Sequence, residues 1–437
     1  MNYYTEPARR IPVVAEADVL VVGGGPAGFA AAVNAARQGA RTYLFEQSGA
    51  VGGVATTGLM SHWTGNTRGG FYEELLERAN DWHGDEAALR LRNWPARQLM
   101  NPEKLKTVML EMLAEAGVIL RLYSFASAPL LEGNRVAGVI TESKSGREAW
   151  RAKVTVDASG DGDIAAQAGV PFHKGRESDG KMQPMTLMFK VAGVDTDRAV
   201  FPNQFEETFP VPAGDLQQLG REQLPPPAGH VLLYQSTLPG VVTCNMTNCT
   251  GVDGTSVADL TRAEMLCRKQ IDRIVRFLRE YVPGFENCFL ISSASQIGVR
   301  ETRHFQGEYT LTEEDVLAAR VFPDWAVTKA HFNFDVHSLD SSGLDPTGAQ
   351  DGFRQTAGYT IPYRCFVPQK VDQLLLAGRN ISGTHLAHSN FRVMPICANM
   401  GQAVGIAAAL CAKGGIRPRD LEVQELQAIL REQGVCP

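Results

Sequence analysis

Short apolar runs that end in glycine alternate with helical patterns at the start of the chain. Residues 17–22 (ADVLVV) are rich in β-branched side chains, as in a strand buried on both faces of a parallel sheet. A glycine turn over 23–28, an alanine-rich helix ending near Gly39 and a second strand over 41–45 follow in order. This order predicts an α/β fold of the doubly wound, Rossmann type.

The pattern further along the chain predicts more helices and strands. Residues 101–117 have a helical pattern, with Asn101 as the N-cap and Gly117 as the C-terminal stop. Long helices are predicted over 257–282 and 395–413. Strands are predicted over 118–122, 126–131, 135–141, 149–157, 289–297 and 371–377, with a hairpin turn at 133–134.

The chain length and the distribution of glycine turns and prolines predict two domains. A chain of 437 residues exceeds what one compact core usually holds. The glycine turns stop near residue 180, where prolines become frequent, and return after Tyr359. We therefore predict a discontinuous nucleotide-binding domain over 1–179 and 356–437, with an α+β substrate domain inserted at 180–355.

Composition and charge narrow the classes of partner. Forty-two basic and 48 acidic residues give a net charge of −6, which argues against nucleic acids and anionic membranes as partners. The eight cysteines show no C-x-x-C pair and no zinc or iron–sulfur spacing, so we expect free thiols, a cytoplasmic location and no metal. Residues 393–412 carry no charge, but Pro395, Asn399 and Gln402 favour a buried helix over a membrane span.

The glycine turn after the first strand is a candidate ligand-binding site. In its Gly-x-Gly-x-x-Gly pattern, Gly23 allows a tight turn, Gly25 lets a pyrophosphate approach the backbone, and Gly28 lets the helix pack on the strand. The helix then begins at Pro26 and Ala27, and its N-terminus offers unpaired N–H groups and a partial positive charge to phosphates. The alternative is a structural turn that holds no ligand.

An acid stands at the end of the second strand. Glu46 lies 18 residues after Gly28, where a carboxylate can accept hydrogen bonds from a ribose diol and disfavours a 2′-phosphate. This first motif does not separate FAD from NAD.

Further motifs carry a resemblance to a known family. They are VVGGGPAG (21–28), VGGVATTG (51–58), DASGDGD (157–163), GVRETR (298–303) with GEYTLTEEDV (307–316), and LLLAGRNIS (374–382) followed by THLAH and RVMPICANMGQAVGIAAAL. With them the chain resembles the bacterial FAD-dependent oxidoreductases related to glutathione-reductase-type flavoproteins, over nearly its whole length. The resemblance implies an extended FAD across the discontinuous domain, with the flavin meeting the substrate at the second domain.

The resemblance also indicates which residues would hold FAD beyond the first turn. In this fold class the N-terminus of the helix that begins at Pro395 points at the flavin pyrimidine, where its dipole would stabilise the negative charge of the reduced ring. The further residues that we expect at the cofactor are Gly53, Ser159, Gly160, Asp161, Gly378, Arg379, Asn399, Met400 and Gly401.

A first group of candidate catalytic residues directly precedes this helix. It consists of His385, His388 and Arg392. The spacing of His388 and Arg392 is similar to the His-x-x-x-Arg of fumarate-reductase-type flavoproteins, where such residues bind a substrate carboxylate. The glycine–asparagine context of those enzymes is absent, so a dicarboxylate substrate does not follow. The alternative is that Arg392 pairs with a local acid.

A second group follows a predicted strand. It contains Arg300, Glu301 and Arg303, together with Asp335 and His337 in FNFDVHS. A run of charges usually marks a solvent-exposed edge. The match to the family motif supports the alternative, that these residues belong to a functional site. We expect the imidazole of His337 to titrate near neutral pH.

Three smaller expectations concern single residues. Cys397, at the start of a helix, should have a lowered thiol pKa. Cys397 has no partner cysteine for a disulfide-reductase role. His62, in the glycine-rich stretch after Glu46, could face the flavin. The remaining histidines are expected to be ordinary surface or core residues: His83, His173, His230, His304 and His331.

Together these features predict a FAD-dependent oxidoreductase or dehydrogenase. It would transfer a hydride between flavin N5 and a small polar molecule, either a sugar- or polyol-like hydroxyl compound or an activated alkene. No second glycine motif for NAD(P)H is present, so the electron donor or acceptor stays open, as does a homo-oligomeric state. The alternatives are a non-redox FAD-binding protein or sensor in a complex, and a thiazole-biosynthesis or halogenase-like relative.

Overall fold

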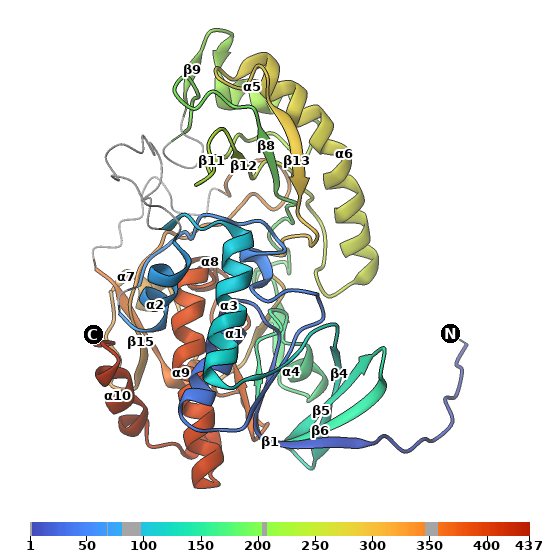
Figure 1. Ribbon diagram of the computed structural model, residues 1–437, viewed down its shortest axis with the longest axis vertical. Coiled ribbons are helices and arrows are strands. Elements are labelled where there is room, and N and C mark those ends of the chain that lie inside the picture. Colours follow the sequence, from blue (N-terminus) through green and yellow to red (C-terminus); the bar gives the residue numbers. More distant parts are fainter. Residues whose placement is uncertain (1, 68, 81–97, 203–207, 346–356) are drawn as a thin grey trace.

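The chain folds into a larger part around one sheet and a smaller part beside it (Figure 1). The computed structural model describes residues 2–67, 69–80, 98–202, 208–345 and 357–437. Both chain termini belong to the larger part, and helix α6 lies along one side of the smaller part.

A seven-stranded sheet forms the centre of the larger part, in the order β3-β2-β1-β6-β5-β4 with β17 beside β6. Its strands are β1 (Val13–Val22), β2 (Thr42–Phe45), β3 (Ile119–Arg121), β4 (Phe125–Glu132), β5 (Arg135–Ser143), β6 (Gly146–Asp157) and β17 (Leu374–Leu376). Strands β2, β1, β6 and β17 are parallel, whereas β4 and β5 form the predicted antiparallel hairpin. The predicted doubly wound sheet is confirmed, and the carboxyl ends of β1, β6 and β17 meet at one edge, where such folds bind ligands.

Three long helices cover this sheet: α1 (Pro26–Arg37), α3 (Pro102–Ala116) and α9 (Met394–Gly414). Asn101 caps α3 by accepting a hydrogen bond from the Glu103 N–H, and Gly117 ends it in the left-handed region at φ +78°. Both were predicted. The shorter helical elements of the larger part are η1 (Gly53–Ala55), α2 (Phe71–Ala79), α4 (Asp163–Gln167), α7 (Glu313–Leu317), η3 (Tyr363–Cys365), α8 (His385–Phe391), η4 (Pro418–Asp420) and α10 (Val423–Glu432).

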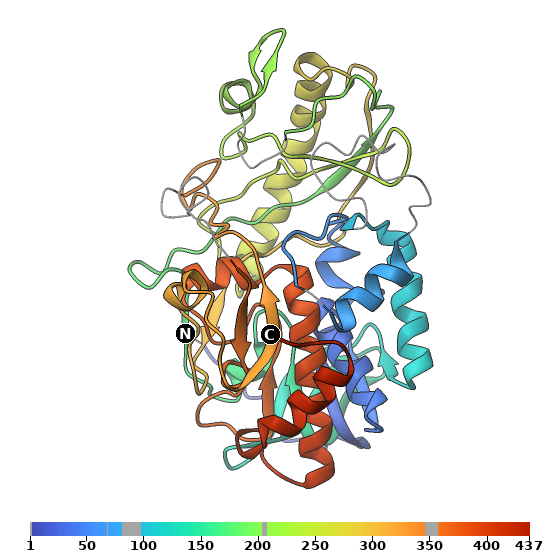
Figure 2. The ribbon, with the colours of Figure 1, turned by 90° about the vertical axis from the view of Figure 1, so that its left-hand side faces the viewer.

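Helix α9 packs directly on α1, beside it in both views (Figures 1 and 2). A Cβ atom at Gly401 would lie 2.0 Å from the Ala27 carbonyl oxygen, and one at Gly405 would lie 2.2 Å from that of Ala31. The glycine spacing of α9 therefore brings two helix backbones into contact. The helix is long and apolar enough to cross a membrane, but 94% of its most apolar window is buried inside the protein, as predicted for a core helix.

A four-stranded antiparallel sheet with the order β11-β12-β8-β13 forms the smaller part. Its elements are β8 (Phe189–Ala192), β9 (Pro210–Val211), β10 (Gly214–Asp215), α5 (Leu216–Gln223), β11 (Leu233–Gln235), β12 (Val242–Cys244), α6 (Val257–Tyr281) and β13 (Phe289–Ser293). A second hydrophobic core of its own, built mainly from residues 185–297, holds this part together.

Residues 305–334 pack with the larger core rather than with this second one. Two antiparallel pairs place them there: β14 (Arg303–Phe305) pairs with β7 (Phe172–Lys174), and β15 (Trp325–Ala330) pairs with β16 (Tyr359–Pro362). The domain boundaries at 180 and 355 stay predictions, and this packing favours an earlier end for the inserted domain. Strands β13 and β17 are shorter than their sequence patterns predict.

The contact between α1 and α9 can be tested by adding one methyl group. Gly405→Ala should destabilise the protein by about 3 kcal/mol, because the new Cβ must push two helix backbones apart. Gly414→Ala, at the end of the same helix, is the matched control, because its Cβ would lie in ordinary contact 3.6 Å from Ile416. Denaturant unfolding of both variants measures the difference, and equal stabilities would contradict the packing.

Candidate functional site

The first glycine turn lies between the end of β1 and the start of α1. Gly23 has φ +92°, and a Cβ there would lie 2.5 Å from the Ala158 carbonyl oxygen; one at Gly28 would lie 1.8 Å from the Gly23 oxygen. These two glycines are therefore required for packing. A Cβ at Gly25 would meet no described atom within 4 Å, so the turn faces open space at the residue that precedes the helix.

This end of α1 suits a phosphate group. Gly25 is the N-cap and Pro26 occupies the first turn, as predicted, and none of the described side chains caps the helix. The first N–H groups of a helix need acceptors, and the helix dipole favours an anion as the acceptor. The open space beside Gly25 allows the close approach that a pyrophosphate requires.

Glu46 lies at the end of β2, directly beside this turn. Its Oε2 accepts a hydrogen bond from the Gly24 N–H at 2.8 Å, and its Oε1 accepts one from the Ser48 N–H at 2.8 Å. Two backbone donors thus fix the carboxylate next to the nucleotide turn. Its contact with a ribose stays a prediction.

The other predicted cofactor turns come together at the same sheet edge. The loop at Gly53 approaches the first turn, since a Cβ there would lie 3.2 Å from the Gly25 Cα. The Asp161 carboxylate pairs with Arg379 at 2.7 Å and accepts a hydrogen bond from the Thr302 hydroxyl at 2.7 Å. Sequence motifs more than 200 residues apart therefore meet here.

Single contacts place the remaining cofactor candidates. The Ser159 hydroxyl donates to Asp157, Gly160 lies against the Arg379 guanidinium, and Gly378 has φ +95°. Asn399 and Gly401 make contacts within the protein: Asn399 accepts the Tyr72 N–H and donates to the Gly69 oxygen, and Gly401 faces α1. Met400 is fully buried. Contact of these residues with a cofactor stays a prediction.

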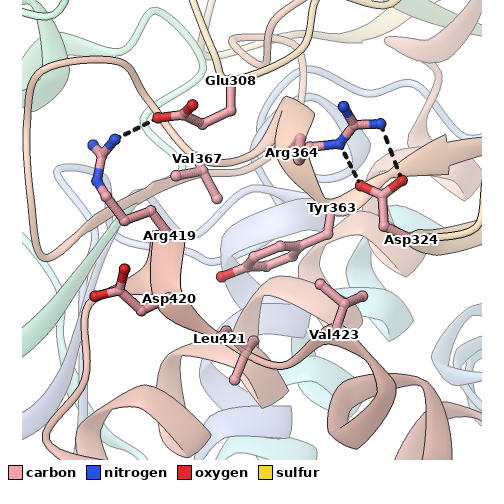
Figure 3. A pocket seen from close by; sticks show the side chains of 9 residues that line it. All are labelled: Glu308, Asp324, Tyr363, Arg364, Val367, Arg419, Asp420, Leu421 and Val423. Atoms are coloured by element: carbon pink, nitrogen blue, oxygen red, sulfur yellow. Dashed lines mark hydrogen bonds and ion pairs between the residues drawn. The ribbon is translucent and has the colours of Figure 1, made fainter.

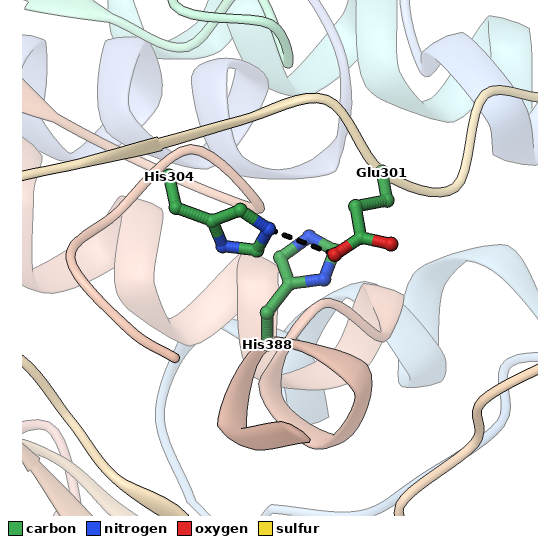
Figure 4. A group of neighbouring side chains, drawn as sticks. All are labelled: Glu301, His304 and His388. Atoms are coloured by element: carbon green, nitrogen blue, oxygen red, sulfur yellow. Dashed lines mark hydrogen bonds and ion pairs between the residues drawn. The ribbon is translucent and has the colours of Figure 1, made fainter. Parts of the chain in front are cut away.

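Glu301 is the centre of a buried group of histidines, part of which Figure 4 shows. Its Oε1 accepts hydrogen bonds from His304 Nε2 at 2.8 Å and from His385 Nδ1 at 2.6 Å, and its Oε2 accepts the Gln183 N–H at 3.0 Å. The ring of His388 lies edge-on to that of His304, with 4.7 Å between the centroids. Helix α8 supplies His385 and His388, and strand β14 supplies His304.

These contacts set the protonation of the group. Burial alone would raise the pKa of Glu301, but the hydrogen bonds from His304 and His385 outweigh it and hold that pKa well below its ordinary value. Burial would lower the pKa of His385, but Glu301 raises it above the ordinary value. Burial first, and then electrostatic repulsion from the neighbouring His304, hold the pKa of His388 well below its ordinary value, so this imidazole is neutral at pH 7.

Hydrogen bonding explains this geometry better than a metal does. One donor atom each from Glu301, His304 and His388 lies within 4.8 Å of the others, as a metal site requires. Two ligands of a tetrahedral zinc ion, each about 2.1 Å from the metal, would lie roughly 3.4 Å apart. The 2.8 Å between His304 and Glu301 is instead the length of a hydrogen bond.

The second candidate group lies next to the first, around Gln183. Arg392 Nη2 donates to Asp335 Oδ2 at 3.0 Å and to Gln183 Oε1 at 3.4 Å, so Arg392 does pair with a local acid. The His337 N–H donates to the same Gln183 oxygen at 3.1 Å. Arg300 Nη1 donates to the Pro184 carbonyl at 2.6 Å and to the Thr186 hydroxyl at 2.7 Å. All five predicted catalytic residues therefore come together.

The sequence matches the family described as FAD dependent oxidoreductase over residues 18–430. The chain belongs to the FAD-dependent oxidoreductase family. Its cofactor is FAD, and the protein is an enzyme. The open turn at Gly25 and the uncapped start of α1 fit the FAD pyrophosphate, and Arg379 adds a buried Nη1 that has no partner among the described residues.

The chain is also similar to solved structures. A geranylgeranyl bacteriochlorophyll reductase-like protein from Thermoplasma acidophilum has a TM-score of 0.50 and 15% identity, with 96% of this chain and 84% of that chain covered. p-Nitrophenol 4-monooxygenase PnpA from Pseudomonas putida DLL-E4 gives 0.47 and 12%, covering 92% and 81%. The myxobacterial chondrochloren halogenase CndH gives 0.44 and 13%, covering 95% and 78%. A comparison with curated protein sequences gives no match.

The structure of this FAD-dependent oxidoreductase corrects two predictions, and both concern buried groups. The pKa of His337 lies well below its ordinary value because of burial and then of the Arg300 charge, so the prediction that it titrates near neutral pH is wrong. Burial raises the pKa of Cys397 to about 12, so the predicted lowering at the helix start is wrong as well. In both cases burial disfavours the charged form, which lowers the pKa of an imidazole and raises that of a thiol.

Three other residues have separate outcomes, and whether His62 faces the flavin stays a prediction. His62 is buried with its ring stacked on Tyr234, 3.3 Å between centroids, and burial lowers its pKa to about 3. Arg303 lies outside the cluster and donates to Asp161 and Asp163. His83 lies outside the described residues.

Sequence reasoning missed two residues of the site. His304 was set aside as an ordinary histidine, although it follows Glu301 by three positions within the family motif. Gln183 stands in a stretch without any pattern, and only the fold brings its side chain to Arg392.

Substitutions of Gly25 and Gly28, two glycines of the nucleotide turn, should have opposite effects. Gly25→Val should leave the apoprotein as stable as the wild type, because its side chain meets only open space, yet FAD binding should be lost because the side chain stands where phosphate must approach. Gly28→Val should unfold the protein, because its Cβ would overlap the Gly23 oxygen. Flavin absorbance after reconstitution and thermal unfolding of the apoproteins measure the two effects.

The ion pair of Glu301 predicts a pH-dependent stability. Glu301→Gln should cost about 3 kcal/mol where Glu301 and His385 are both charged, because a buried imidazolium loses its partner. Because the carboxyl pKa of Glu301 is lowered, its contribution to stability is present above the ordinary value of 4.5. Because the imidazole pKa of His385 is raised, its contribution to stability is present below 6.5 and is lost as the pH rises further. Denaturant unfolding should thus show the largest difference between pH 4.5 and 6.5 and a smaller one at pH 9.

Glu308→Gln is the control for this series. Glu308 pairs with Arg419 on the surface, where such a pair contributes at most about 1 kcal/mol. A cost for Glu301→Gln that does not change with pH would contradict the assigned charges.

Proposed function

We propose that this enzyme transfers a hydride between flavin N5 and a small polar substrate, either a sugar- or polyol-like hydroxyl compound or an activated alkene. The observation that carries the proposal is the buried Glu301–histidine group directly before helix α9, with two arginines beside it. Such a site can move one proton and hold a polar substrate, which is what hydride chemistry asks of the protein.

Each residue of the group has a distinct task in the proposal. When bound, FAD supplies the hydride acceptor or donor at its N5 atom. His388, which is neutral at pH 7, takes the proton of a substrate hydroxyl during oxidation; during the reduction of an alkene it first takes up a proton from water and then gives that proton to a carbon. Its Nδ1 is buried and has no hydrogen-bond partner among the residues that the structure describes.

Glu301 acts on the histidines rather than on the substrate. By accepting hydrogen bonds from His304 and His385 it fixes the orientation of both rings, and its negative charge stabilises a protonated His388. Helix α9 starts at Met394 without a side-chain cap among the described residues, so its N-terminal dipole can stabilise negative charge on a reduced flavin.

Several finer points belong to the proposal. A place among the glutathione-reductase-type flavoproteins is supported by the three glycine turns and the C-terminal helix. A small molecule or a separate carrier exchanges electrons with the flavin, and a cytoplasmic location remains a prediction. The second candidate is a non-redox FAD-binding protein or sensor, which no contact of the site favours.

Anaerobic flavin bleaching tests the proposal. Sugars, polyols, hydroxy acids and, with the pre-reduced enzyme, unsaturated acids are screened for a change in flavin absorbance. His388→Gln should keep the flavin spectrum and lose about 100- to 10,000-fold of the rate, because a proton-transfer group is removed. Bound flavin that responds to no compound would favour the non-redox alternative, and an unchanged rate in His388→Gln would remove its role.

A further inference from the structure

Arg300 carries a buried positive charge without a carboxylate partner. Its side chain is buried, with 9% of the residue exposed. Its Nη1 donates to two neutral oxygens, those of Pro184 and Thr186. Within the described part of the chain it forms no ion pair. A buried charge is costly unless it is paired, so Arg300 has unused capacity for an anion.

The surroundings of Arg300 do not neutralise it. Arg392 disfavours the charge of Arg300 and the Asp335 carboxylate favours it, but Asp335 is paired with Arg392 at 3.0 Å and forms no ion pair with Arg300 among the described residues. Burial keeps the imidazole of His337 neutral, and it lowers the pKa of His230 to about 4. Glu301, which accepts the Gln183 N–H, is balanced by His385, so that the two arginines and Asp335 leave one net positive charge among these side chains.

Two further hydrogen-bond donors in the same place lack acceptors. Gln183 Nε2 and Arg392 Nε are both buried, and neither has a partner among the described residues. The amide of Gln183 cannot be turned round without loss, because its oxygen accepts from the His337 N–H and from Arg392. Buried donors rarely stay unpaired in a folded protein, so an acceptor of two or more lone pairs is expected here.

A surface hollow of about 390 Å³ provides a contrast (Figure 3). It also contains two arginines, but each has an acid of its own. Arg364 pairs with Asp324 at 2.8 Å, and Arg419 contacts Glu308 and pairs with Asp372 at 2.8 Å. Because its charges are balanced, this hollow has no need of an anion.

We propose that Arg300, Gln183 Nε2 and Arg392 Nε form a subsite for one carboxylate group of the substrate. A single carboxylate matches both the one surplus positive charge and the number of unpaired donors, and planar guanidinium groups recognise carboxylates well. The inference rests on the proposed function for the meaning of "substrate". Within the proposed substrate classes it selects hydroxy acids and unsaturated acids over neutral sugars and polyols.

Ligand binding by the holoenzyme tests the subsite without turnover. Acetate and glycolate are titrated at constant ionic strength, with the uncharged acetamide and ethylene glycol as matched probes. The flavin absorbance spectrum and the melting temperature report binding. Both carboxylates should shift the spectrum and raise the melting temperature, and the uncharged probes should do neither; equal responses to both kinds of probe would overturn the subsite.

Substitutions then assign the binding to the residues. Arg300→Met should weaken acetate binding about 10- to 100-fold, because a charge-assisted hydrogen bond is lost. Gln183→Glu keeps the oxygen that serves Arg392 and His337, replaces the free donor by an acceptor and neutralises the surplus charge. It should abolish acetate binding while the protein melts at the same or a higher temperature. Arg364→Met, at the balanced surface hollow, should bind acetate like the wild type.

The flavin itself is the other source of negative charge. If Arg300 serves the reduced flavin, Arg300→Met and Gln183→Glu will lower the flavin midpoint potential and leave acetate affinity unchanged, and the subsite is refuted. Should Arg300→Met fail to fold, Gln183→Glu decides alone. Arg300-dependent acetate binding in an enzyme that no compound bleaches would remove the proposed function and keep the subsite.

Discussion

Helices α1 and α9 come from opposite ends of the chain and touch backbone to backbone, because Gly401 and Gly405 carry no side chain where α9 crosses Ala27 and Ala31. The nucleotide turn at the start of α1 and the histidine group directly before α9 are both anchored by this contact. A wider separation of the helices would move the two halves of the site apart by at least the width of a methyl group. The positions of turn and cluster relative to each other thus depend on a contact between two helix backbones.

Where structure is local, the sequence predicts it well. The β1–turn–α1–β2 unit, the Asn101 cap and the hairpin at 133–134 follow from chemistry within a few residues, and all are present. The sheet edge could be predicted for the same reason, since parallel strands followed by glycine turns meet at one side. The limits of the inserted domain could not be predicted, because residues 305–334 pack with the larger core through pairing with strands that are distant in the sequence.

The candidate site shows the same division. Motifs identified the residue types and the two charge clusters, but not that both clusters surround Gln183, whose position depends on distant segments. The two wrong pKa predictions, for His337 and Cys397, have one cause: a sequence shows neighbours along the chain and not the depth of burial. His304 could have been found, since its place three residues after Glu301 in a charged motif was visible.

The crossing of α1 and α9 also has a consequence for biosynthesis. Strand β1 and the phosphate turn emerge from the ribosome long before α9 does. Until it arrives, the alanine-rich face of α1 that α9 will cover is open to water. Stable capture of the nucleotide must therefore wait until α9 has been synthesised, and the nascent chain has to remain soluble without it.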